Sequence, residues 1–163
     1  MASENASVAY SFVTRWYLDA DIASVFAVIE DAPAWPSWWK AVASVETLRE
    51  GGPDGVGAVT RSVWRSALGY RLRFDARLTR KVPPVELEVE ATGDLLGRGL
   101  WQLAPWGGGT LVVYSWQVAT HRRWMNVLAP LLRPAFAWNH RVAMRWGGEG
   151  LARRLGVRFE DRT

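Results

Sequence analysis

The chain has 163 residues, a hydrophobic content of 49%, a charged content of 22% and a formal net charge of +4. This length suits one domain over residues 1–163, and the composition is that of an ordinary folded globular protein. No apolar run reaches the roughly 20 residues that span a bilayer, and residues 1–5 lack the character of a signal peptide.

Residue types that carry covalent or metal chemistry are scarce. The sequence has no cysteine and two histidines, against eleven tryptophans. We therefore expect no disulfide, no thiolate nucleophile, no metal and no other cofactor, and the lack of cysteine suits a cytoplasmic protein. An indole buries a large apolar area and keeps one N–H donor, so the composition favours apolar surface over catalysis.

The basic residues are spread along the chain. Lys40 and Lys81 are the only lysines, so all the others are arginines. A scattered pattern is typical of a solvated surface, so we expect no nucleic-acid partner. The alternative is a weak contact with an anionic membrane. It would use the arginines of the last predicted helix: Arg133, Arg141, Arg145, Arg153 and Arg154.

The first part of the chain predicts a strand and two short helices. Residues 10–18 are rich in aromatic and β-branched types, as strands are. Asp19 or Asp21 can cap the next helix, which has an apolar stripe between positions 22 and 29. A second helical turn is expected to begin near Pro36.

Six further strands are expected, at 42–49, 57–66, 70–78, 85–91, 99–103 and 110–120. In the third and fourth of these, apolar and charged residues alternate with a period of two. Successive strand residues point to opposite faces, so each strand has one apolar and one charged face. The link through Pro83 and Pro84 is short, and we expect the two strands to pair antiparallel with arginines near glutamates.

The C-terminal region predicts helix over 124–133 and again over 134–155, with Pro134 opening the second segment. Trp138, Val142 and Trp146 recur at helical spacing and should form a stripe that faces the sheet. Glycines at 147, 148 and 150 indicate either a close approach to the sheet or fraying. The order of elements predicts the α+β class.

Several local motifs carry a family resemblance. They are Leu18-Asp19-Ala20-Asp21-Ile22, Trp35-Pro36-Ser37-Trp38-Trp39, the hairpin from Gly93 to Pro105, and the ending formed by Trp138-Asn139-His140 and Gly150–Leu155. In their order the chain resembles the polyketide cyclase/dehydrase and lipid transport family of the START-like (SRPBCC) superfamily, and its ending resembles that of one bacterial branch.

The resemblance implies a helix-grip fold, in which a curved antiparallel sheet of about seven strands surrounds a long C-terminal helix. An apolar cavity is expected between them. Family members bind lipids, sterols, polyketides or other hydrophobic small molecules, and some are cyclases or dehydratases. No catalytic residue is common to the family, so the resemblance leaves open whether this chain is an enzyme.

We interpret the aromatic residues of the strands and the last helix as cavity walls. The candidate ligand-binding residues are Trp64, Tyr70, Phe74, Trp101, Tyr114, Trp116, Trp138, Asn139, Val142 and Trp146. The alternative is that they fill the core completely. Arg61 and Arg65 alternate with Trp64, so either face of that strand could point inward, and the facing of Trp101 is equally open. Asn139 or Gln117 would orient a polar end of the ligand.

His140 is the one candidate for catalysis, as an acid or base, and a structural histidine is the simpler alternative. We thus predict a bacterial protein that binds a small hydrophobic molecule. The alternatives are a cyclase- or dehydratase-type enzyme, a lipid or quinone carrier at a membrane surface, and a stress-related or regulatory partner-binding protein without an internal ligand.

Overall fold

The computed structural model describes residues 9–120 and 122–163. The elements, in chain order, are β1 (Ala9–Leu18), α1 (Ile22–Glu30), the 3-10 helix η1 (Ala32–Ser37), β2 (Val42–Arg49), β3 (Val59–Arg65), β4 (Arg71–Val82), β5 (Glu86–Gly93), β6 (Leu95–Trp106), β7 (Gly109–Thr120), α2 (Arg123–Leu155) and β8 (Phe159–Asp161). The predicted α+β class and helix-grip arrangement are confirmed.

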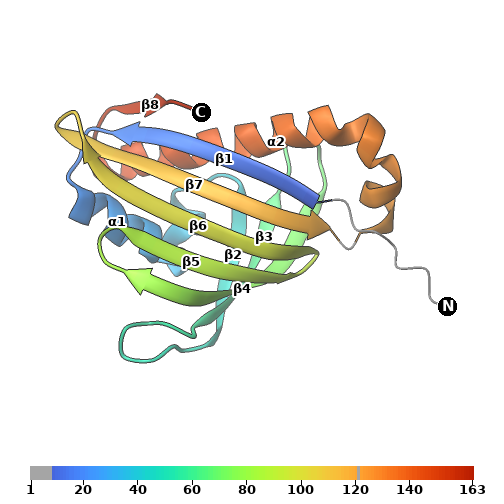
Figure 1. Cartoon of the computed structure of the whole chain (residues 1–163), viewed down its shortest axis with the longest axis horizontal. Coiled ribbons are helices and arrows are strands. Elements are labelled where there is room, and N and C mark those ends of the chain that lie inside the picture. Colours follow the sequence, from blue (N-terminus) through green and yellow to red (C-terminus); the bar gives the residue numbers. More distant parts are fainter. Residues whose placement is uncertain (1–8, 121) are drawn as a thin grey trace.

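The strands form one antiparallel sheet in the order β2-β3-β4-β5-β6-β7-β1-β8. The sheet curls, so that β2 and β3 lie behind the strands at the front of Figure 1, and α2 runs along its open side. This helix contacts β1, β7 and β8. Through Asn139 it also hydrogen-bonds to the turn between β3 and β4, so α2 bridges the two sides of the curled sheet.

The two short helices follow from local sequence. Asp21 is the N-cap of α1, because its carboxylate accepts from the backbone N–H of Ser24 at 3.1 Å. The next helix begins at Ala32, earlier than the predicted start near Pro36. Pro33 occupies its first turn, where the missing N–H donor costs nothing, and this position explains the difference.

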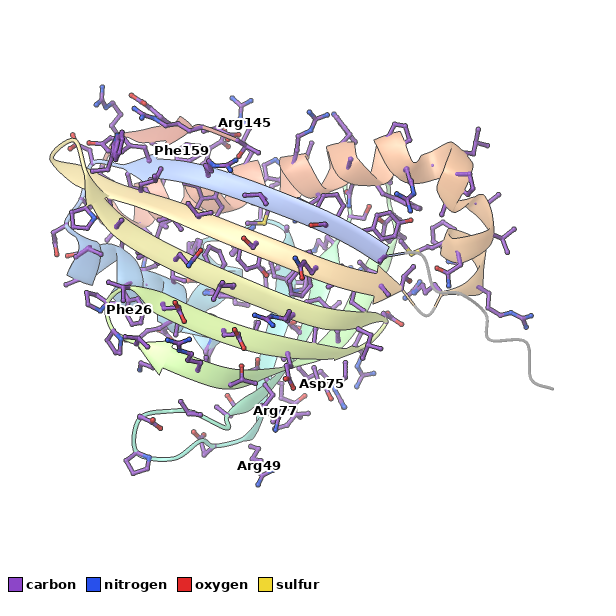
Figure 2. All side chains as sticks on the ribbon, viewed as in Figure 1. Phe26, Arg49, Asp75, Arg77, Arg145 and Phe159 are labelled. Carbon is purple, nitrogen blue, oxygen red and sulfur yellow. The ribbon has the colours of Figure 1, made fainter. Side chains whose placement is uncertain are left out.

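The pairing of β4 with β5 confirms the alternation of charged and apolar faces. Arg77 lies opposite Glu90, and its guanidinium reaches that carboxylate at 2.7 Å on the outer face. Figure 2 shows Arg77 and Asp75 on this outer side. Such exposed pairs add little to stability. The pairs do identify the outer face of the two strands. The apolar residues of both strands therefore lie on the concave side.

The C-terminal helical region is one continuous helix, so the predicted boundary at Pro134 is wrong. Pro130 and Pro134 both lie inside α2, and both are exposed. A proline has no N–H to donate, so it removes one helical hydrogen bond and bends the helix. On the exposed side of a helix, the carbonyl that loses its donor can bind water instead. Figure 1 shows the first turns of α2 bent away from the rest of the helix.

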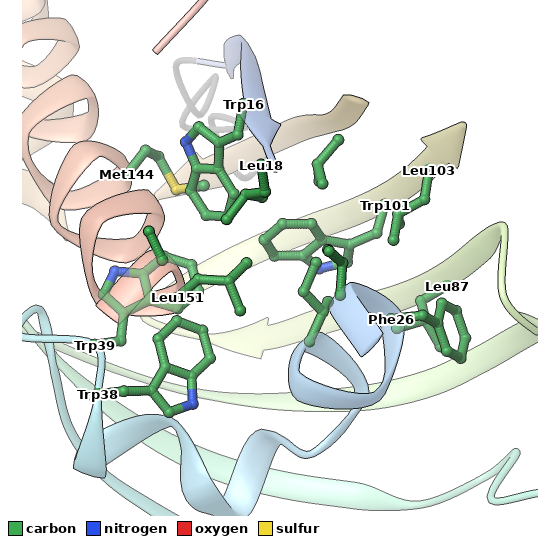
Figure 3. Close-up of a cluster of buried hydrophobic side chains, with 14 of the residues drawn as sticks. Trp16, Leu18, Phe26, Trp38, Trp39, Leu87, Trp101, Leu103, Met144 and Leu151 are labelled. Carbon is green, nitrogen blue, oxygen red and sulfur yellow. The ribbon is translucent and has the colours of Figure 1, made fainter. Parts of the chain in front are cut away.

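The main core lies where α1, η1 and the second half of α2 meet the sheet (Figure 3). Trp39 is almost completely buried, and its indole N–H donates to the carbonyl of Ala143 on α2 at 2.8 Å. Gly147 and Gly150 let α2 approach Trp39 and Trp38 closely. The glycines therefore mark close packing. Beyond Gly156 the chain forms β8, which pairs with β1 and was not predicted.

Candidate functional site

The inward-facing residues of the sheet and of α2 enclose a cavity of about 360 Å³. Pockets that bind small molecules commonly measure about 300–1,000 Å³, so this volume suits one small ligand. The main core fills the space beside α1, and the cavity continues from it between the sheet and α2. The walls are mostly aromatic and aliphatic side chains.

Five rings from two pairs of adjacent strands, β3 with β4 and β6 with β7, form a continuous surface, which we call the aromatic wall: Trp101, Tyr114, Trp116, Phe74 and Trp64. The rings of Trp101 and Tyr114 stack with centroids 4.0 Å apart, and Tyr114 stacks on Trp116 at 5.9 Å. Phe74 joins Trp116 to Trp64 with centroid distances of 5.9 Å and 6.2 Å. Antiparallel register aligns these residues, because inward positions of one strand lie opposite inward positions of the next.

The register also settles which faces of β3 and β6 point inward. Arg61 lies opposite Asp75 and its Nε donates to that carboxylate at 2.8 Å on the outer face, so Trp64 points inward. Trp101 lies opposite Tyr114 and is buried against the cavity.

Gly99 leaves room for two rings of the aromatic wall. It faces inward on β6, directly opposite Trp116. A methyl group at this position would lie 2.7 Å from the Tyr114 hydroxyl and 2.9 Å from the Trp116 ring. Any side chain here would force these rings to shift, so the glycine sets their position.

Asn139 joins α2 to the turn between β3 and β4 at one end of the cavity. Its Oδ1 accepts from the Ser66 hydroxyl at 3.0 Å and from the Ala67 N–H at 2.7 Å. Its Nδ2 donates weakly to the Tyr70 hydroxyl at 3.4 Å. The amide is therefore occupied in holding the fold together. Gln117, the other residue expected to orient a ligand, is exposed on the outer face of β7.

His140 lines the cavity with its ring stacked on Phe12, the centroids 4.2 Å apart and the planes 12° from parallel. Burial lowers the pKa of His140 from 6.5 to about 4, so the imidazole is neutral near pH 7. Within residues 9–120 and 122–163 its side chain makes no hydrogen bond that meets ordinary geometry. A neutral imidazole keeps one donor and one acceptor.

Two tyrosines lie near His140. Tyr10 packs edge-on against Phe136, and its hydroxyl is buried without a hydrogen-bond partner in the described part of the chain. Tyr70 contacts the same phenyl ring from another side. Burial raises the pKa of both phenols, so they are neutral. We call Tyr10, Tyr70, Asn139 and His140 the polar end of the cavity.

The opposite end of the cavity, beside the C-terminus of α1, is lined by two charged side chains. Glu30, the last residue of α1, pairs with Lys81 of β4 at 2.5 Å. Lys81 lies opposite the buried Leu87, hence on the inward side of its strand. Both charged residues line the cavity and both side chains are partly exposed, at 22% for Lys81 and 32% for Glu30. This ion pair therefore stands between the cavity and solvent.

Seven of the ten proposed ligand-binding residues line the cavity, and three do not. Trp138 is 47% exposed, Trp146 lies beneath the Lys40 ammonium, and Val142 is half-buried on the flank of α2. The prediction that this stripe faces the sheet is therefore wrong for Trp138. The inward stripe of α2 is instead Phe136, His140, Ala143 and Met144. Adjacent helix positions differ by about 100° in direction, so Trp138, two positions from both Phe136 and His140, points about 160° away from them, toward the other side of the helix.

Sequence reasoning missed several residues of the lining, among them Tyr10 and Phe12 of β1. Both lie on the inward face, opposite Val118 and Trp116 of β7. Their period-two spacing was visible in the sequence. The sequence does not show that β1 pairs with β7, which is far along the chain. Without this pairing the inward face of β1 is undetermined.

Residues 9–120 and 122–163 contain no group of three or more acidic, histidine or cysteine side chains placed to hold a metal ion. In the same ranges, no helix has both the length and the apolar character needed to cross a membrane.

The sequence model of the polyketide cyclase/dehydrase and lipid transport family matches residues 18–144. No curated protein sequence matches the chain. Among solved structures, TTHA0849 from Thermus thermophilus has a TM-score of 0.69 and 20% identity, with 89% of this chain and 99% of that one covered.

Two larger proteins also share the fold. The di-domain ARO/CYC StfQ from the steffimycin biosynthetic pathway has a TM-score of 0.66 and 16% identity over 92% of this chain. The di-domain ARO/CYC BexL from the BE-7585A pathway has a TM-score of 0.66 and 21% identity over 88%. This chain spans about half of each, 53% and 50% respectively. At such identities the likeness concerns the fold alone.

Proposed function

Because this chain belongs to the polyketide cyclase/dehydrase and lipid transport family, whose members bind hydrophobic ligands, we propose that it holds one small hydrophobic molecule between the sheet and α2. The observation that carries the proposal is the aromatic wall bordering a cavity of about 360 Å³. Apolar burial supplies about 25 cal/mol per Å². A ligand that hides about 200 Å² of apolar surface gains roughly 5 kcal/mol before the cost of its immobilisation.

The polar end gives the ligand an orientation. His140 is neutral and Tyr10 has a buried hydroxyl without a partner in the described residues, so both can hydrogen-bond to a ligand. No lysine or arginine shares this end as a lining residue apart from Arg65, whose guanidinium donates to the Lys40 carbonyl. Arg133 lies over the Tyr10 ring, with its Cζ 5.5 Å from the ring centroid, but it is not part of the lining, so an anionic group inside the cavity would have no direct cationic partner there. We therefore propose a ligand with an apolar body and an uncharged ketone, hydroxyl or phenol group.

A cyclase- or dehydratase-type enzyme is the second candidate, because the family that this chain belongs to is described by that activity as well as by lipid transport. In this case the cavity would act by holding a substrate in a reactive conformation, with His140 as the first residue to test. A base is most effective when its pKa is near the working pH, and the low pKa of His140 weakens this role. Unchanged turnover of a confirmed substrate by His140→Ala would eliminate it.

The binding proposal is tested with a neutral fluorescent probe, N-phenyl-1-naphthylamine, and with native mass spectrometry of freshly purified protein. Ala76 lines the cavity on β4, so Ala76→Phe fills part of it and should weaken probe binding at least tenfold. The matched control is Ala104→Phe on the exposed face of β6, which should bind like the parent. Equal probe affinity in both folded variants, or no binding by the parent and no co-purifying molecule, would refute the proposal.

A further inference from the structure

Five apolar side chains of α2 are exposed along its first half: Trp124, Val127, Leu128, Leu131 and Trp138. We call this set the apolar stripe. Counted from Trp124, the other four lie three, four, seven and fourteen positions further on, so all five share one side of the helix. Val127 and Leu131 are the most exposed, at 76% and 78%. A monomeric soluble protein seldom exposes an apolar patch of this extent without a partner for it.

The opposite side of the same helical segment is also apolar. Met125, Ala129 and Phe136 are buried there, and Met125 and Phe136 line the cavity. Trp124 stands between the two sides, because its ring meets Tyr70 and Phe136 edge-on at 5.7 Å and 6.2 Å. The buried side satisfies the fold, so the apolar stripe is left for a second environment.

The free charge beside the apolar stripe is positive. Arg123 and Arg141 are exposed on this part of α2 and make no ion pair with the described residues, whereas Arg133 lies over the Tyr10 ring on the other side of the helix. From position 121 to position 148 the sequence contains no aspartate or glutamate. An environment that fits this surface must therefore offer both an apolar phase and negative charge.

A second copy of the chain fits poorly. In a two-fold symmetric contact the same surface meets itself, so the arginines of one copy would face those of the other without acidic partners. An anionic bilayer offers lipid chains for the apolar residues and acidic headgroups for the arginines. We propose that the first half of α2 lies on the surface of an anionic membrane, with the apolar stripe in the boundary between headgroups and chains.

This placement brings the membrane within one helix diameter of the cavity, because Met125, Phe136 and His140 line the cavity from the other side of the same segment. The surface is distinct from the lining and does not depend on what the cavity holds. A membrane test therefore stands apart from the test of ligand binding.

The experiment is co-sedimentation of the full chain with vesicles of phosphatidylcholine, alone or mixed with phosphatidylglycerol. We expect sedimentation with the mixed vesicles only, falling as NaCl rises. Leu131→Glu should reduce the bound fraction at least tenfold. The matched control is Leu96→Glu, which makes the same change at an exposed site on β6 and should bind like the parent.

A second pair of variants separates the apolar stripe from total charge. Arg123→Gln with Arg141→Gln should weaken vesicle binding more than Arg153→Gln with Arg154→Gln, although each pair removes two positive charges. Circular dichroism and probe affinity report whether each variant still folds and keeps its cavity.

Three results would overturn the proposal. The first is no sedimentation of the parent with anionic vesicles. The second is equal binding by folded Leu131→Glu and Leu96→Glu. The third is a concentration-dependent dimer that Leu131→Glu dissociates, because this would assign the apolar stripe to self-association instead of a membrane.

Discussion

The buried imidazole of His140 makes the stability of the fold depend on pH in a way that can be calculated. Its pKa is about 4 in the folded chain against 6.5 as the ordinary value, because burial disfavours the charged form. The unfolded chain therefore binds a proton at a higher pH than the folded chain does. The free energy of unfolding keeps its full value above pH 6.5 and falls as the pH drops toward 4.

The magnitude follows from linkage. Each pH unit between the two pKa values removes about 1.4 kcal/mol of stability for one proton. At pH 5 the loss is about 2 kcal/mol, and at pH 4 it approaches roughly 3 kcal/mol. At pH values well below 4 both states are protonated and His140 contributes no further loss.

The assay is urea unfolding, followed by far-ultraviolet circular dichroism, for the parent and for His140→Gln at several pH values between 7 and 4. Carboxylates also titrate in this range, but both chains share them, so the difference between the two unfolding free energies isolates His140. We expect that difference to shift by about 2 kcal/mol in favour of the variant between pH 7 and pH 5. Parallel curves would refute the reasoning, since they would mean that His140 takes up its proton as easily in the folded chain as in the unfolded one.

The other predictions concern the two ends of the cavity. Asn139→Ala removes two good acceptor contacts, to Ser66 and Ala67, and should lower the free energy of unfolding by about 2–3 kcal/mol in urea titrations. Asn139→Asp keeps acceptor oxygens in place and should recover more than half of that loss; equal losses would contradict this explanation. Lys81→Met removes the ion pair with Glu30 and should speed probe release in stopped-flow measurements, with less than about 1 kcal/mol change in stability. An unchanged release rate would show that this pair does not restrict the cavity opening.

Local sequence rules predicted the sheet well, for a physical reason. The alternation in β4 and β5 determines the two faces of each strand, and the acidic cap at Asp21 determines where α1 begins. These are interactions between residues close in the chain or on adjacent strands. The same motifs predicted the family, which the match over residues 18–144 confirms.

Local sequence rules could not predict which face of α2 points toward the cavity. The helix carries apolar residues around its circumference, from the buried Phe136 to the exposed Leu131, so periodicity alone does not select an inward face. The bonds from Asn139 to Ser66 and Ala67 contribute to that orientation, and they join residues more than 70 positions apart. Seven of the ten candidate residues reach the cavity, and their contact with a ligand stays a prediction.

One missed strand and one unresolved orientation have the same origin. The strand β8 has only three residues, and pairing with β1 rather than any strong pattern of its own makes it a strand. The inward facing of Trp64 was ambiguous because arginines flank it, and only the register that places Arg61 opposite Asp75 decides it.

The aromatic wall has an optical consequence. Trp64, Trp101 and Trp116 border the cavity, whereas Trp16 and Trp39 are sealed inside the main core. Indole emission responds to polarity and to nearby absorbing groups, so a molecule that enters the cavity would change the light from the first set directly. The chain thus carries its own fluorescent sensor of occupancy, and candidate compounds can be screened without attaching a dye.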